Sequence, residues 1–159
     1  MLDFLLRAIV IGVGATILFD LWQILLNRTL GIPLPNWAMT GRWFLHLPRG
    51  RFVHENIAAA EPMLNELAAG WIGHYLIGVL FAAATLIIGG AGWAKSPTLL
   101  PPLIVGWITI GCGWFILQPG MGAGVAASKR PDANRVRLLN IAGHTVFGLG
   151  MFLTALLIR

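Results

Sequence analysis

Hydrophobic residues form four long runs, and the stretches between the runs hold most of the charged residues. The runs are residues 4–26, 67–89, 98–117 and 138–158. A helix needs about 20 apolar residues to cross the hydrocarbon core of a bilayer, and each run meets that length. The pattern therefore predicts an all-α integral membrane protein, with four spanning helices in a single transmembrane domain of residues 1–159.

The first long connection, residues 28–66, contains a segment in which apolar and aromatic residues surround Arg42. These residues are Trp37, Trp43, Phe44 and Leu47. Such a segment is typical of a short helix lying in the lipid headgroup region, where tryptophan is common for reasons of solvation alone. A surface that docks lipid or a partner is the alternative. Three polar residues of this connection are interpreted as solvated loop residues: His46, His54 and Glu55.

The second long connection, residues 118–137, opens with three alternating glycines at Gly120, Gly122 and Gly124. They resemble a phosphate-binding loop only superficially, because no strand precedes them and no Gly-Lys-Ser/Thr follows. We expect instead a turn that ends a helix, or backbone packed closely against a neighbouring element.

Composition and charge agree with the membrane class. The chain is 57% hydrophobic and 11% charged, whereas ordinary soluble domains are about a quarter charged. The lipid bilayer is therefore the expected main partner. The net charge of +5 does not indicate nucleic-acid binding, because the basic residues form no compact face.

The basic residues also predict an orientation. Eight of the 11 Lys and Arg residues lie in the two long connections: Arg28, Arg42, Arg49, Arg51, Lys129, Arg130, Arg135 and Arg137. Cytoplasmic loops of membrane proteins carry an excess of Lys and Arg. Both connections are therefore expected in the cytoplasm and both termini outside it.

The second and fourth runs share a Gly-His-x-x-x-Gly pattern, which begins at Gly73 and at Gly143. The first and third runs align more weakly. This internal repeat predicts a four-helix bundle made of two similar helical hairpins, related by a pseudo-twofold axis along the membrane normal.

The repeat places polar groups at one depth. Asp20, His74 and His144 each lie about 10–12 Å in from a cytoplasmic helix end, at 1.5 Å per residue. Asn140 lies one turn before His144, and Cys112 falls near the same level. An ionised carboxylate within a bilayer is energetically unfavourable unless a polar group contacts it. A histidine at this depth is therefore expected to pair with Asp20.

Four interpretations of this cluster are open. It can be a structural hydrogen bond that fixes helix register, or part of a proton or small-solute pathway. His74 and His144 can be axial ligands of haem or a chlorophyll-type pigment. A metal site can combine both histidines with Asp20 and Cys112.

A resemblance to a known family rests on motifs along the whole chain: Gly41-Arg42-Trp43 with His46, then Gly50, Phe52, His54 and Ile57, then Gly73-His74-Tyr75-Leu76-Ile77-Gly78, then Gln118-Pro119-Gly120-Met121-Gly122-Ala123-Gly124 with Ala126-Ala127-Ser128, and His144 with Phe147-Gly148-Leu149-Gly150. They resemble a bacterial family of small inner-membrane proteins catalogued only as a domain of unknown function. The resemblance implies four helices and a bacterial inner-membrane location. It implies no activity and no functional residue.

The function favoured by the residues is proton-linked or small-solute transport through the Asp20, His74, His144 and Asn140 cluster. The alternative is an accessory or structural subunit of a larger membrane complex, with haem or pigment held by His74 and His144. An enzyme is not favoured, because Gly-x-Ser-x-Gly and His-Glu-x-x-His motifs are lacking. A homodimer or attachment to a larger membrane complex is also expected, since glycine-rich helix faces need neighbours.

Overall fold

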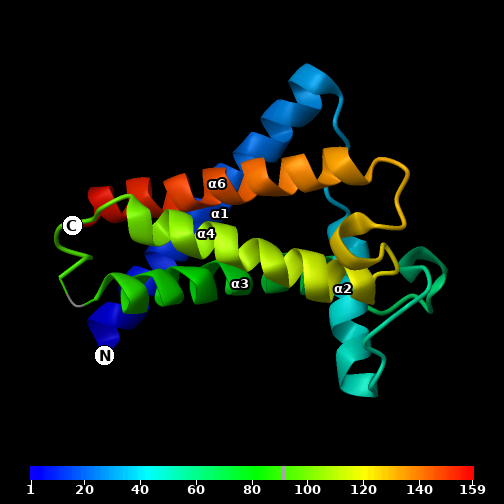
Figure 1. The fold of residues 1–159 in the computed structure, drawn as a ribbon. Coiled ribbons are helices and arrows are strands. Elements are labelled where there is room, and N and C mark those ends of the chain that lie inside the picture. Colours follow the sequence, from blue (N-terminus) through cyan, green and yellow to red (C-terminus); the bar gives the residue numbers. More distant parts are fainter. Residues whose placement is uncertain (91) are drawn as a thin grey trace. The chain divides into compact units, whose positions relative to one another are not determined.

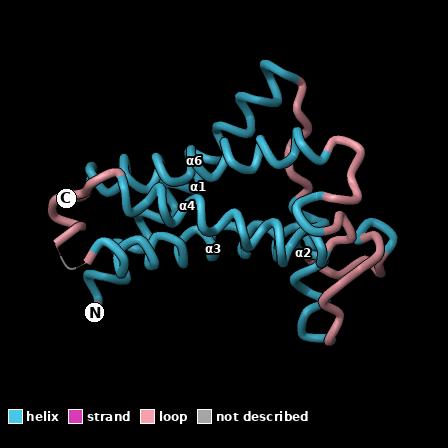
Figure 2. The backbone as a smooth tube through the Cα atoms, viewed as in Figure 1, coloured by secondary structure: helices cyan, strands magenta, loops and turns pink. Residues whose placement is uncertain are grey.

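The computed structural model describes residues 1–90 and 92–159, and over them the chain is helical without strands (Figures 1 and 2). The elements in order are α1 (Leu2–Leu30), α2 (Trp37–His46), η1 (Leu47–Arg49), η2 (Ile57–Ala59), α3 (Glu66–Gly89), α4 (Leu100–Cys112), η3 (Gly113–Leu117), α5 (Gln118–Gly120), η4 (Val125–Ala127) and α6 (Ala133–Leu157). Helices long and apolar enough to cross a membrane are Leu2–Leu30, Glu66–Gly89, Leu100–Gly120 and Ala133–Leu157. The predicted all-α fold with four spanning helices is therefore confirmed.

The helix ends differ from the ends of the hydrophobic runs. α1 continues to Leu30 and stops at Gly31, whose N–H donates to the Asn27 carbonyl. The φ of 63° at Gly31 turns the chain so that the Ile32 N–H donates to the Leu26 carbonyl. α6 begins at Ala133, several residues before its hydrophobic run. Hydropathy marks only the apolar part of a helix, whereas backbone hydrogen bonds continue through polar residues until a cap intervenes.

The third spanning helix, Leu100–Gly120, is interrupted by one π-helical turn, η3. A π-turn inserts an extra residue into the helix and changes which side chains share a face. The hydrophobic run alone gives no sign of this turn.

The chain divides into two compact units, and three spanning helices, α3, Leu100–Gly120 and α6, each contribute residues to both. The first unit comprises Met1–Leu34, Tyr75–Thr109 and Ile141–Arg159. Its core consists of small and apolar side chains: Ala8, Ile11, Ala15, Ala82, Leu86, Trp93, Val105, Phe147, Met151 and Ala155. Close helix packing is essential here, since a Cβ on Gly12 in α1 would overlap the backbone of Val79 in α3.

Large apolar side chains cover the outside of the first unit. Those at least half exposed include Leu5, Leu80, Ile108 and Leu153. A water-soluble protein rarely exposes so much contiguous apolar surface. This face is suited to contact with lipid acyl chains, in keeping with a multi-pass membrane protein.

The second unit comprises Pro35–His74 and Ile110–Asn140. Its central element is α2, whose predicted helix is confirmed and begins at Asn36, where the side chain accepts a hydrogen bond from the Met39 N–H. α2 crosses the start of α3 closely, because a Cβ on Gly41 would overlap the carbonyl oxygen of Glu66.

Trp43 in α2 differs from an interfacial tryptophan. Its side chain is buried, only 6% exposed, and its Nε1–H donates to the Phe52 carbonyl at 2.9 Å. It also packs against Gly120, where a Cβ would overlap the indole. Trp43 therefore anchors α2 to the glycine-containing turn inside the protein.

That turn ends the third spanning helix, as predicted. The His54 N–H donates to the Gly120 carbonyl at 2.9 Å, and the Ile57 N–H donates to the Met121 carbonyl at 3.2 Å. Gly122, with a φ of 92°, brings its backbone against the carbonyl of Glu55. The glycines thus allow two irregular backbone segments to pack together.

Candidate functional site

In the first unit, an acidic side chain in the middle of a spanning helix meets a phenol from another helix. The Tyr75 Oη–H of α3 donates to Asp20 Oδ2 of α1 at 3.1 Å. Both side chains are half-buried. A carboxylate at this position is costly unless polar groups contact it, and the phenol is one such group. Sequence reasoning did not identify Tyr75 as a partner of Asp20, and the pairing of Asp20 with a histidine stays a prediction.

His144 of α6 is also held within the first unit, by the backbone of α4. Its Nδ1 lies 2.9 Å from the Gly106 carbonyl oxygen and 3.3 Å from Thr109 Oγ1. A carbonyl only accepts hydrogen bonds, so Nδ1 carries the hydrogen and Nε2 the lone pair. Gly106 permits the approach, because a Cβ there would overlap the His144 carbonyl.

His74 and Asn140, the other two predicted site residues, belong to the second unit. The His74 imidazole stacks on the Trp37 indole, with ring centres 3.9 Å apart and planes 25° apart, and Trp71 is 5.9 Å away. Trp37 is therefore a contact that the sequence did not reveal.

Asn140 accepts two hydrogen bonds through Oδ1. The donors are Trp114 Nε1–H at 3.0 Å and Gln118 Nε2–H at 2.9 Å. Trp114 lies within the π-helical turn η3, and Gln118 follows this turn directly. This network ties α6 to the third spanning helix within the second unit.

The predicted cluster is thus divided between the two units. Asp20 and His144 lie in the first, whereas His74 and Asn140 lie in the second. The convergence of all four side chains on one point, and the internal repeat, stay predictions. Cys112 is exposed, and the described residues contain no group of three or more His, Cys, Asp and Glu side chains placed to hold a metal.

The second unit also contains an ion pair between a buried arginine and a half-buried glutamate, which sequence reasoning had assigned to loop charge. Arg42 is 7% exposed and makes a bidentate contact with Glu66, Nε to Oε2 at 2.8 Å and Nη2 to Oε1 at 2.9 Å. Its Nη1 donates to the carbonyls of Ile57, Ala58 and Ala60. The hydrogen bond to Glu66 raises the pKa of Arg42 above its usual value. The guanidinium therefore acts as a fixed structural charge.

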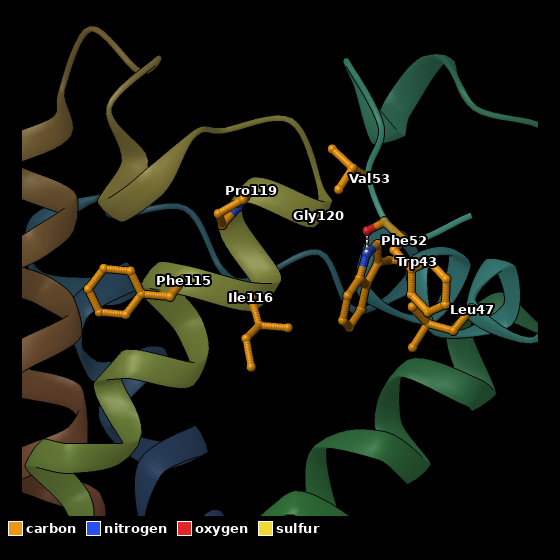
Figure 3. A pocket seen from close by; sticks show the side chains of 8 residues that line it. All are labelled: Trp43, Leu47, Phe52, Val53, Phe115, Ile116, Pro119 and Gly120. Carbon is orange, nitrogen blue, oxygen red and sulfur yellow. Dashed lines mark hydrogen bonds between the residues drawn. The ribbon is translucent and has the colours of Figure 1, made fainter. Parts of the chain in front are cut away.

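An apolar groove of about 360 Å³ also lies in the second unit (Figure 3). Its lining residues are Trp43, Leu47, Phe52, Val53, Phe115, Ile116, Pro119 and Gly120. The Trp43 N–H, the one side-chain polar group in this lining, is already bonded to Phe52. The groove therefore offers apolar contacts and no recognition of a polar solute.

Sequence comparison agrees with the resemblance noted above. A family model matches residues 9–158, which is nearly the entire chain. The chain belongs to the family described as protein of unknown function (DUF2938). No curated protein and no solved structure matches this DUF2938 chain. Membership agrees with the four-helix fold and assigns no role to Asp20, His74, His144 or Asn140.

Proposed function

We propose that this DUF2938 chain conducts protons across a membrane as part of proton-linked or small-solute transport, with Asp20 as the group that gains and loses the proton. The observation that carries the proposal is the hydrogen bond from Tyr75 to Asp20 within the spanning helices. Ionisable side chains within spanning helices are rare and commonly mark ion or proton pathways.

The chemistry of the phenol suits a carboxyl group that changes its protonation state. An uncharged hydroxyl can donate to an ionised carboxylate and equally to the carbonyl oxygen of a protonated carboxyl. The contact therefore persists through a cycle of protonation. A bidentate guanidinium partner would instead favour the ionised form strongly.

His144 supplies a second proton-exchanging group in the same unit. Because its Nδ1–H is directed at the Gly106 carbonyl, its Nε2 lone pair is the one that accepts a proton. The wider proposal includes His74 and Asn140 as further polar groups of the pathway. It also places the protein in the bacterial inner membrane with both termini outside the cytoplasm, which terminal reporter fusions can check.

The test uses the full chain in liposomes that contain a pH-sensitive dye. An imposed potential should drive proton entry into wild-type vesicles, and Asp20→Asn should abolish it while the protein keeps its helical content and melting temperature. Asp3→Asn is the matched control, because Asp3 lies on the same helix with its side chain 81% exposed. The proposal fails if Asp20→Asn conducts protons like the wild type, or if both Asp variants lose flux equally.

One observation favours the second candidate, an accessory membrane subunit that holds haem. Histidines that ligate metals usually donate the other ring N–H to a carbonyl or carboxylate, and His144 has this arrangement with Gly106. The Nε2 of His144 would be one axial ligand of the haem, and His74 is the predicted second axial ligand. Protein expressed with added haem should then show a Soret band that His144→Ala removes. A colourless protein contradicts this candidate.

A homodimer is the remaining part of the proposal. It is supported by the outward apolar surface of the first unit, which a second copy or lipid can cover. Sedimentation of the detergent-solubilised chain, corrected for bound detergent, distinguishes one copy from two.

A further inference from the structure

His46, which the sequence suggested was a solvated loop residue, is completely buried at the end of α2, with 0% of its surface exposed. Its Nε2 lies 3.0 Å from the Glu61 carbonyl oxygen. Because the carbonyl can only accept, Nε2 carries the hydrogen and Nδ1 carries a lone pair. This Nδ1 is buried and has no hydrogen-bond partner among the described residues.

His54, on the segment between η1 and η2, repeats this arrangement with the opposite nitrogen. Its Nδ1 lies 3.1 Å from the Gly120 carbonyl oxygen, which also accepts from the His54 backbone N–H. The lone pair therefore resides on Nε2, which is again buried without a hydrogen-bond partner in the described part of the chain. Two bonds to one carbonyl fix the position of this ring.

The two rings lie next to each other within the second unit. Their centres are 5.0 Å apart and their planes are inclined by 67°. Each ring is tied to a backbone carbonyl and has one lone pair left over. A buried acceptor without a donor is unfavourable, so two neighbouring rings that each carry one point to a bound species that accepts electron pairs.

The geometry agrees with a shared metal ion. Two imidazoles that bind one tetrahedral ion at nitrogen–metal distances of about 2.0–2.1 Å place their ring centres roughly 5 Å apart. The carbonyl contacts of the other ring nitrogens are those that orient ligating histidines in metal sites. Imidazole nitrogen suits late first-row ions such as zinc, copper and nickel.

We propose that His46 Nδ1 and His54 Nε2 bind a late first-row transition-metal ion, with zinc as the reference case. No third His, Cys, Asp or Glu side chain among the described residues joins them, so water completes the coordination. The ion would link the end of α2 to the segment that carries His54, which is bonded to the Gly120 carbonyl. This metal-site proposal does not depend on the transport proposal.

The test is zinc titration of the purified full chain in detergent, after removal of any affinity tag and treatment with a chelator. Calorimetry should detect one ion per chain. His46→Ala and His54→Ala should each weaken zinc binding at least about tenfold, by analogy with losses seen when even supporting partners are removed. Glu55→Gln is the matched control, because this carboxylate directly follows His54 but is exposed, and its replacement should leave zinc affinity unchanged.

A second measurement does not depend on variants, since a fully buried ring such as His46 can be needed for folding. X-ray absorption of the zinc-loaded wild type should show two imidazole nitrogens at about 2.0–2.1 Å from the metal. The proposal is overturned if the wild type binds no stoichiometric zinc, if both variants bind as tightly as wild type, or if the spectrum lacks imidazole scattering.

Discussion

Two acidic side chains, one in each unit, differ in the charge of their hydrogen-bond partner. Glu66 in the second unit receives two parallel hydrogen bonds from the buried guanidinium of Arg42, at 2.8 and 2.9 Å. Asp20 in the first unit receives a hydrogen bond of 3.1 Å from the uncharged phenol of Tyr75. Both acids are in candidate spanning helices, α3 and α1.

The difference separates a structural acid from a candidate functional one. A carboxylate matched to a guanidinium gains its stabilisation only while it is ionised. A carboxyl group that meets a hydroxyl keeps this contact in both protonation states. The second unit is therefore expected to respond to the loss of charge with unfolding, and the first with loss of activity.

The largest effect is expected for Glu66→Ala. Removal of the Glu66 carboxylate leaves the buried Arg42 charge with only backbone carbonyls as acceptors, and we expect a cost of about 3 kcal/mol, the lower end for broken buried pairs. Arg42 is 7% exposed, so water cannot easily replace the carboxylate. Chemical denaturation in mild detergent measures the free energy of unfolding. Arg42→Lys keeps the positive charge but not the bidentate contact, so its free energy of unfolding should lie between those of the wild type and Glu66→Ala. A loss below about 1 kcal/mol, typical of exposed pairs, would contradict the structural role.

Gly41→Ala tests the helix crossing that places Arg42 beside Glu66. A Cβ on Gly41 would overlap the Glu66 carbonyl, and overpacking of this kind costs about 1–3 kcal/mol. Gly113→Ala is the control, because a Cβ there would meet no atom within 4 Å. Alanine at position 113 should leave stability unchanged or raise it by up to about 1 kcal/mol. Equal effects of both substitutions on the melting temperature would contradict close packing of α2 on α3.

Asn36→Ala removes the cap at the start of α2. The Asn36 side chain accepts from the Met39 N–H at 3.2 Å, and loss of such a cap costs about 1 kcal/mol. Asn36→Asp restores an acceptor and should retain most of the stability. If both variants unfold at the wild-type denaturant concentration, the cap does not stabilise α2.

Tyr75→Phe should have the smallest effect on stability and a clear effect on function. Hydrogen bonds between helices in membranes contribute about 0.6 kcal/mol on average, far less than the loss expected for Glu66→Ala. Proton flux in liposomes should fall because the phenol no longer positions the Asp20 carboxyl. The distinction between the two acids would be lost if Tyr75→Phe destabilised the protein as much as Glu66→Ala. It would also be lost if Tyr75→Phe left the proton flux unchanged.

The sequence alone determined the class of the protein and most of its helices. Four apolar runs of sufficient length predict four spanning helices, and the residues around Arg42 predict α2, because both signals depend only on local composition and periodicity. The glycines at 120, 122 and 124 predicted a turn with closely packed backbone, since glycine has no Cβ to prevent it. Family resemblance agreed with these features because it rests on the same residues.

Only the tertiary structure decided which polar groups meet. The contacts of Tyr75 with Asp20, of Arg42 with Glu66 and of His46 with a carbonyl join segments at least 15 residues apart. They depend on the rotation and approach of packed segments, which hydropathy does not encode. A histidine in a polar connection therefore looked solvated until its burial was known, because burial is a property of the packed chain and not of its local sequence.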